Sequence, residues 1–193
     1  KNQGHTVTFY HDRNENEEVL IERARNAEVV VVSNIPLRKH FFENCPKLRM
    51  LSVAFTGVDH IDLEAAKELG ILVCNASYAP DAVADFTIMM ILMCLRQYKQ
   101  AFWRGYVNDF SLTGLQGKNM RAMTVGVMGT GRIGQQVIRD LQGFGCRILA
   151  YDVHQNEETA KMAEYTDLET LYRECDIITL HMPLLPSTRH MIN

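Results

Sequence analysis

At residues 125–134 the chain reads Val-Gly-Val-Met-Gly-Thr-Gly-Arg-Ile-Gly, a G-x-G-x-x-G pattern between an apolar run typical of a strand and an amphipathic segment typical of a helix. In such a pattern Gly129 makes a tight turn, Gly131 lets a pyrophosphate approach the backbone, and Gly134 lets the helix pack against the strand. The N–H groups at the start of the helix then face the phosphate charge. The pattern predicts a dinucleotide-binding turn, with a purely structural glycine-rich connection as the alternative.

An acidic residue follows the next expected strand. That strand covers residues 146–151, and Asp152 comes directly after it, close to the spacing of about 20 residues expected of a ribose-binding carboxylate. Its two oxygens can accept hydrogen bonds from ribose hydroxyls, and its charge would repel a 2′-phosphate, which favours NAD over NADP. Arg147 and His154 lie close enough in the sequence to weaken this preference.

The composition excludes several classes of protein. Among 193 residues, 20 are Lys or Arg and 23 are Asp or Glu, so the net charge is −3 and no basic stripe indicates nucleic acid as a partner. The five cysteines are scattered without a C-x-x-C pair, which argues against a disulfide framework or a metal site and favours a reducing, cytoplasmic location. The longest apolar run, residues 86–95, is too short to span a membrane.

Strand-like and helix-like segments alternate along the chain, which predicts an α/β fold with two Rossmann-like parallel-sheet domains. The valine-rich run at residues 28–32 is typical of a strand buried on both faces. A long apolar helix over residues 81–98 separates the halves, so we expect domains at residues 1–98 and 99–193. The remaining expected strands cover residues 6–10, 48–55, 70–74, 124–128 and 176–180, and the remaining expected helices cover residues 17–27, a segment from Asp62, residues 132–142 and a segment from Thr166.

Four sequence blocks match one known family in order and spacing. They are residues 56–62 (Thr-Gly-Val-Asp-His-Ile-Asp), residues 80–85 (Pro-Asp-Ala-Val-Ala-Asp), the glycine motif, and residues 180–184 (Leu-His-Met-Pro-Leu) with 188–193 (Thr-Arg-His-Met-Ile-Asn). On these blocks the chain resembles the D-isomer-specific 2-hydroxyacid dehydrogenases over nearly its whole length. Residues 80–152 most resemble the D-lactate dehydrogenases that accompany vancomycin resistance.

The resemblance implies a flavodoxin-like substrate domain that ends in an interdomain helix and a Rossmann domain that binds NAD. It also implies hydride transfer between the nicotinamide and a short, pyruvate-like 2-keto acid, which interconverts with the D-2-hydroxy acid. Family members place the catalytic Arg, acid and His after the block that ends here at Asn193, and a further strand before Lys1. We therefore expect an internal fragment, with both domains truncated, that does not turn over alone.

The resemblance further assigns binding roles by position. The backbone of Thr56, Gly57 and Val58 would hold the substrate carboxylate, with Tyr78 beside the substrate, while His60 is open to a structural or a functional reading. The implied cofactor-binding residues are Gly129, Gly131, Arg132, Ile133, Gly134, Asp152, Met182, Pro183 and Thr188. The aromatic-rich segment 101–116 is expected to pair the NAD domains in a homodimer. An alternative function is an NAD-sensing, corepressor-type binding protein on the same scaffold.

Overall fold

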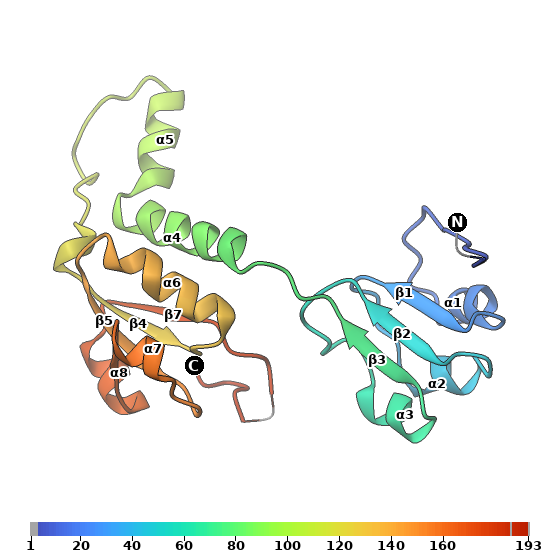
Figure 1. The fold of residues 1–193 in the computed structure, drawn as a ribbon. Helices are drawn as coiled ribbons and strands as arrows, with labels where there is room; N and C mark the ends of the chain where they lie inside the picture. Colours follow the sequence, from blue (N-terminus) through green and yellow to red (C-terminus); the bar gives the residue numbers. More distant parts are fainter. Residues whose placement is uncertain (1–3, 186, 193) are drawn as a thin grey trace. The chain divides into compact units, whose positions relative to one another are not determined.

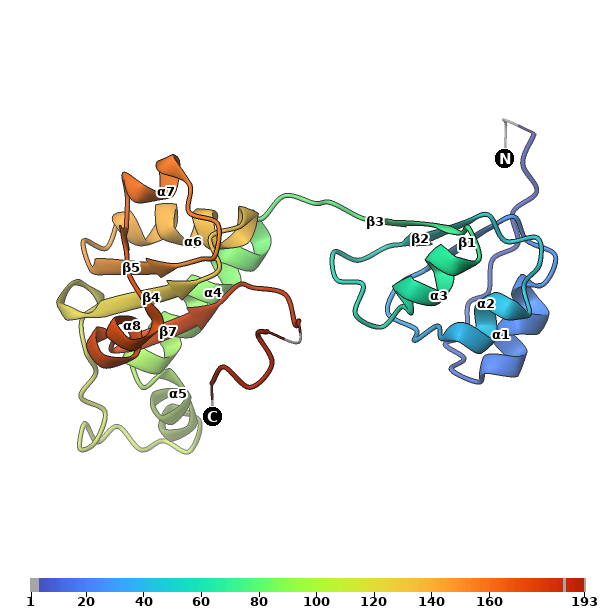
Figure 2. The same ribbon diagram turned by 90° about the horizontal axis from the view of Figure 1, so that it is seen from below.

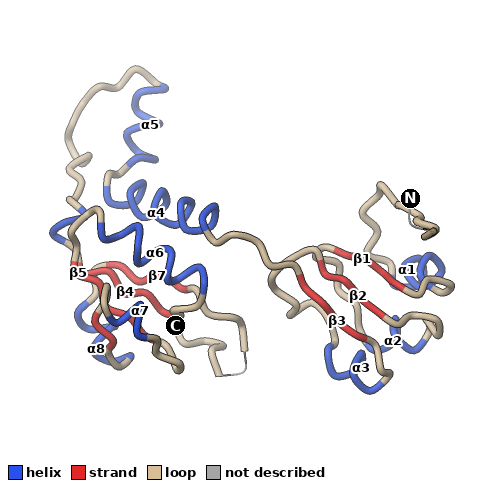
Figure 3. Tube along the Cα trace, in the orientation of Figure 1, coloured by secondary structure: helices blue, strands red, loops and turns tan. Residues whose placement is uncertain are grey.

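The computed structural model describes residues 4–185 and 187–192. The chain forms two compact units, Lys1–Tyr78 and Ala79–Asn193, and in each of them helices and parallel strands alternate (Figure 3). The unit boundary therefore lies before the predicted helix at residues 81–98, and not after it. The reason is that helix α4 (Asp81–Leu95) packs against α6 (Arg132–Gln142) in the core of the second unit.

The first unit contains a three-stranded parallel sheet in the order β1-β2-β3. Its strands are β1 (Val29–Val32), β2 (Met50–Val53) and β3 (Leu72–Asn75), and its helices are α1 (Glu17–Ala24), α2 (Lys39–Glu43) and α3 (Leu63–Glu68). All three helices contribute to one core with the buried side chains of β2. Figure 2 shows the helices on the same side of this sheet.

The burial of β1 corrects one prediction from the sequence. The valine run was expected to be buried on both faces, but Val31 is 68% exposed, while Val30 and Val32 pack against the core. A run of four valines satisfies β-propensity at every position, yet burial alternates because the described helices cover only one face. Periodicity alone does not reveal how many faces of a sheet are covered.

A second prediction fails at residues 6–10, which form no strand. The side chains of this segment are exposed, with Phe9 at 74%, and the backbone pairs with none of the described strands. A strand is stabilised by the ladder it forms with a neighbour, so β-favouring residues without a neighbour stay irregular.

The second unit contains a four-stranded parallel sheet in the order β6-β5-β4-β7. This is the 3-2-1-4 arrangement of part of a doubly wound sheet. Its strands are β4 (Thr124–Met128), β5 (Arg147–Tyr151), β6 (Glu164–Tyr165) and β7 (Ile177–Leu180). Besides α4 and α6, it includes the helices α5 (Tyr98–Tyr106), α7 (Glu157–Ala160) and α8 (Leu168–Glu174), and the short 3₁₀-helix η1 (Met120–Ala122).

Both faces of the central strand β4 are covered. Val125 and Val127 are buried in the core shared with α4 and α6. On the other face Gly126 meets α8 so closely that a Cβ there would stand 3.0 Å from the Leu171 side chain. Figure 1 shows α6 and α8 on opposite sides of the strands. This two-sided cover fixes the carboxyl end of β4, where the glycine loop begins.

The predicted helix over residues 81–98 is in fact two helices. Helix α4 ends at Leu95, and Gln97 adopts a left-handed conformation with φ of 54° before α5 begins. Helix α5 takes in the first part of the aromatic-rich segment 101–116, and ring pairs one turn apart support the helix there. Tyr98 stacks on Phe102, and Trp103 stacks on Tyr106.

Within the described residues, no helix combines the length and the apolar character needed to cross a bilayer.

Candidate functional site

The glycine loop lies at the carboxyl end of the second sheet, between the strands where the strand order reverses. It leaves β4, whose neighbours β5 and β7 end in the same direction, since all pairings of this sheet are parallel. In open α/β sheets the ends of the strands at such a reversal form the usual ligand crevice. The glycine loop, and Asp152 at the end of β5, therefore lie at the edge where this fold binds ligands.

Two glycines of the motif are required by close backbone contacts. Gly129 has a φ of +93°, its N–H donates to the carbonyl of Tyr151 at 2.8 Å, and a Cβ there would stand 2.7 Å from the carbonyl carbon of His181. At Gly134 a Cβ would stand 1.9 Å from the carbonyl oxygen of Gly129. These contacts confirm the turn and the helix packing that the pattern predicts.

At Gly131, the middle glycine of the motif, neither the backbone conformation nor a close contact requires a glycine. Gly131 has an ordinary φ of −67° and a Cβ there would meet nothing within 4 Å. Gly131 is the N-cap of α6, and no side chain forms a cap hydrogen bond at this helix start. The positive end of a helix, with room beside Gly131, fits a pyrophosphate.

Asp152 reaches the same loop from the end of β5. Its Oδ2 accepts hydrogen bonds from the Thr130 backbone N–H and, at 3.1 Å, from the Thr130 hydroxyl, and its Oδ1 accepts from the His154 N–H at 2.9 Å. Partial burial raises the pKa of Asp152, but the hydrogen bonds from His154 and Thr130 outweigh it, so the pKa lies below its ordinary value of 3.8. The carboxylate is therefore ionised at neutral pH.

A polar cluster behind the loop was not found from the sequence. The Thr130 hydroxyl lies 2.7 Å from the hydroxyl of Tyr165 in β6. The Thr130 carbonyl accepts from the side chains of Gln135, at 2.9 Å, and Asn156, at 3.3 Å. These partners come from three different elements, and no spacing rule connects them to the motif. The sequence shows only that a threonine stands inside the glycine-rich turn; its burial, which requires a partner for the hydroxyl, is known from the structure alone.

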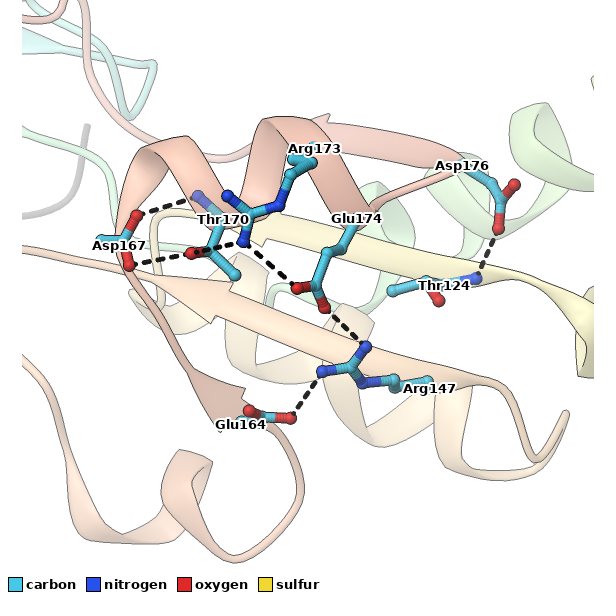
Figure 4. Close-up of polar contacts among 8 residues, drawn as sticks. All are labelled: Thr124, Arg147, Glu164, Asp167, Thr170, Arg173, Glu174 and Asp176. Carbon is cyan, nitrogen blue, oxygen red and sulfur yellow. Dashed lines mark hydrogen bonds and ion pairs between the residues drawn. The ribbon is translucent and has the colours of Figure 1, made fainter.

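Arg147 cannot affect the nucleotide preference as the sequence suggested. It stands at the start of β5, a strand's length from Asp152 (about 3.3 Å per residue), and pairs with Glu164 at 3.1 Å and Glu174 at 2.8 Å. Figure 4 shows this group with the neighbouring contact between Thr124 and Asp176, which joins the starts of β4 and β7. The cluster ties the amino ends of the strands together, on the edge opposite to the glycine loop.

The segment after β7 forms the other wall of the loop. The His181 N–H donates to the carbonyl of Met128 at 2.7 Å, and its ring is hydrogen-bonded to the Thr179 hydroxyl at 2.9 Å. Burial lowers the pKa of His181 below its usual 6.5, so the ring is neutral at pH 7. Met182, half-buried, and the exposed Pro183 follow directly.

The predicted residue Thr188 closes a turn in that segment. Its hydroxyl donates to the carbonyl of Pro183 at 2.7 Å and accepts from the N–H of Leu185 at 2.8 Å. Arg132 and Ile133 begin α6, and Ile133 packs partly against the core. A contact of these five residues with a cofactor stays a prediction.

The residues predicted to bind substrate lie in the first unit. Thr56 and Gly57 are exposed in the loop after β2, whereas Val58 packs against the core. Tyr78 is exposed at the end of the unit. His60 has a structural contact, since its ring nitrogen Nε2 lies 3.0 Å from the carbonyl oxygen of Ser33. The structure leaves the substrate roles of residues 56–58 and Tyr78 as predictions.

In the part of the chain that the structure describes, no three His, Cys, Asp or Glu side chains gather as metal ligands would. The site is thus built from backbone N–H groups, one carboxylate and the hydroxyls behind it. Such groups recognise phosphates and sugar hydroxyls.

Comparison with known proteins identifies the family. A sequence model described as "D-isomer specific 2-hydroxyacid dehydrogenase, NAD binding domain" matches residues 88–193. The chain belongs to this family. Within the D-isomer specific 2-hydroxyacid dehydrogenases, it is 44% identical to a D-specific alpha-keto acid dehydrogenase of Enterococcus faecalis over 145 residues, which cover 75% of this chain and 44% of that protein.

Two further proteins of similar sequence are D-lactate dehydrogenases, and this chain again covers about half of each. A D-lactate dehydrogenase of Escherichia coli is 40% identical over 76% of this chain and 45% of its own length. The structure of D-lactate dehydrogenase from Aquifex aeolicus, complexed with NAD and lactic acid, matches with a TM-score of 0.85 at 35% identity, over 90% of this chain and 53% of that chain. The chain therefore spans about half the length of the relatives it matches, and its second unit is the NAD-binding domain of this family.

Substitution by alanine separates the roles of two motif glycines. Gly134→Ala should lower the free energy of unfolding of the second unit by about 3 kcal/mol, because the new Cβ would force α6 away from Gly129. Gly131→Ala, which adds the same atom into open space, should change it by less than about 1 kcal/mol. Urea denaturation followed by the fluorescence of Trp103, the single tryptophan, measures both. Equal losses for the two variants would contradict the packing described.

Proposed function

We propose that the protein containing this chain is an NAD-dependent oxidoreductase that interconverts a short, pyruvate-like 2-keto acid and its D-2-hydroxy acid. The observation that carries the proposal is the ionised Asp152 held against a glycine loop that opens at the N-terminus of α6. When bound, the nicotinamide would supply or accept the hydride. Membership of the family supports this reaction class.

Different residues of the second unit would bind different parts of the cofactor. Gly131, Arg132 and Ile133 at the start of α6 receive the pyrophosphate, for which the helix end and the absence of a side chain at Gly131 provide the space and the charge. Asp152 accepts from the adenosine ribose. Met182, Pro183 and Thr188 lie on the segment that follows β7 and would line the adenosine side.

The substrate carboxylate is proposed to bind in the first unit. Within the described residues, the N–H groups of Gly57 and Val58 donate no hydrogen bond, and they follow each other in the loop after β2. Successive N–H groups without partners form a concave site suited to an anion. Tyr78 would flank the substrate. We assign no residue of this chain as the proton donor.

We also propose that the protein works in the cytoplasm, because all five cysteines are free thiols, as a reducing compartment would keep them.

We further propose that the protein forms a homodimer through the second unit. Helix α5 buries none of its residues in this chain and exposes Phe102, Trp103 and Tyr106. A group of exposed aromatic rings marks an interface more often than free surface, and one patch can pair with itself about a two-fold axis.

Nucleotide binding tests the cofactor site. Asp152→Asn should weaken NADH binding about tenfold, because hydrogen bonds to a charged acceptor contribute more than those to an amide, while NADPH binding should stay the same or tighten. Titration of NADH and NADPH fluorescence against the 193-residue chain measures both affinities. Asp176→Asn is the matched control, since it lies at the opposite edge of the sheet and should change neither. If Asp152→Asn left the two affinities unchanged, the assignment of Asp152 would be wrong.

The substrate class requires turnover by the whole protein. We expect NADH absorbance to fall with pyruvate, and less quickly with glyoxylate, hydroxypyruvate or 2-ketoisocaproate, with the D-isomer as product. NADH binding without turnover of any of the four would contradict the proposed activity and favour an NAD-sensing binding protein.

Sedimentation velocity tests the dimer. Phe102→Glu should raise the dimer dissociation constant at least tenfold, since it places a charge in the aromatic patch of α5. Phe9→Glu changes another exposed ring, in the first unit, and should leave the dimer intact. A monomeric wild-type protein, or equal effects of both variants, would exclude α5 as the interface.

A further inference from the structure

Consecutive hydrogen bonds lead from Tyr165 through Thr130 to Asp152, and each donor points toward Asp152. An ionised carboxylate only accepts, so the Thr130 hydroxyl, 3.1 Å from Oδ2, must donate to it. The single proton of that hydroxyl is then used, and the Tyr165 hydroxyl, 2.7 Å away, must donate to the Thr130 oxygen. Tyr165 in turn accepts from the backbone N–H of Asn156 at 3.3 Å. Each hydroxyl both accepts and donates, an arrangement in which the bonds strengthen one another.

The chain of hydroxyls approaches the carboxylate from its buried side. Thr130 is only 2% exposed, whereas Asp152 is partly exposed. A carboxylate offers about four acceptor positions. The protein fills two on Oδ2, from the N–H and the hydroxyl of Thr130, and one on Oδ1, from the N–H of His154. The remaining position is on Oδ1, so a ribose hydroxyl has one defined place to donate.

Strand β6 places Tyr165 next to Thr130 and Asp152. It is two residues long, at the edge of the sheet, and Tyr165 pairs with Ala150 in β5, two residues before Asp152. Asn156 holds the other side of the tyrosine hydroxyl and is itself fixed as the N-cap of α7, where its Oδ1 accepts from the Thr159 N–H at 2.8 Å. The tyrosine hydroxyl therefore has a defined partner on each side.

We infer that Tyr165 is a positioning residue for dinucleotide selection: its hydroxyl fixes Thr130, Thr130 helps to fix the orientation of the Asp152 carboxylate, and that orientation presents Oδ1 to the ribose 2′-hydroxyl. This inference rests on the proposed binding of NAD by the Gly129–Gly134 loop. Without the tyrosine hydroxyl, the Thr130 oxygen loses its donor and the Thr130 hydroxyl is held less firmly, so the carboxylate keeps only the N–H groups of Thr130 and His154 as fixed donors. The contact with the ribose 2′-hydroxyl then weakens, whereas a nucleotide that carries a 2′-phosphate has no such contact to lose.

The first experiment compares two nucleotides on the apo chain. Tyr165→Phe should raise the dissociation constant of NADH about fivefold and change that of NADPH by less than about twofold, the size expected when one hydrogen bond of about 1 kcal/mol is lost. Thr130→Val should act in the same direction, the double variant should be no worse than Thr130→Val alone, and Thr130→Ser should retain most of the affinity. Tyr172→Phe is the matched control, because its hydroxyl donates to the Met191 carbonyl and not to the loop.

The second experiment needs no cofactor. The pKa of Asp152, followed by carboxyl NMR titration of the apo chain, should rise in Tyr165→Phe and in Thr130→Val and stay unchanged in Tyr172→Phe. An unchanged pKa in Tyr165→Phe, or equal weakening of NADH and NADPH, would overturn the positioning role. If wild-type NADH binding were insensitive to Asp152→Asn, the proposed function would fail, while the pKa measurement would still decide whether Tyr165 positions the carboxylate.

Discussion

The approach of the first turn of α6 to the end of β4 is the contact on which the site depends. Helix α6 can stand there only because Gly134 brings no Cβ against the carbonyl of Gly129. That contact places the start of the helix, which no side chain caps, beside Gly131. The same turn presses Gly129 against the backbone of His181, so one loop joins the carboxyl ends of β4, β5 and β7. The binding surface follows from backbone packing, before any functional side chain is considered.

The side chains of the site add selectivity to this backbone frame. Asp152 is held by three donors, and its low pKa keeps it charged. Under the proposed function, this fixed negative charge would accept ribose hydroxyls and repel a phosphate. The hydroxyls of Thr130 and Tyr165 lie behind Asp152, on its buried side. The ion pairs of Arg147 lie at the other edge of the sheet.

Sequence reasoning succeeded where local geometry decides the structure. Strand 124–128 and helix 132–142 have the predicted bounds, and the helix predicted from Asp62 is present as α3, which Asp62 caps through the Ala65 N–H. It failed where a distant partner decides. Residues 6–10 lack a strand to pair with, Val31 lacks a helix above it, and α4 joins the second unit through packing on α6. The glycines and Asp152 were found by spacing, but Tyr165 was missed because only the sheet brings it to Thr130.

The central claim is that the loop from Gly129 to Gly134 receives the diphosphate of NAD. Backbone amide chemical shifts during NADH titration of the isotope-labelled chain test it most directly. The account predicts the largest changes at the N–H groups of Gly131, Arg132 and Ile133, with smaller changes around Asp152. Saturating NADH that moved other amides and left these in place would contradict it.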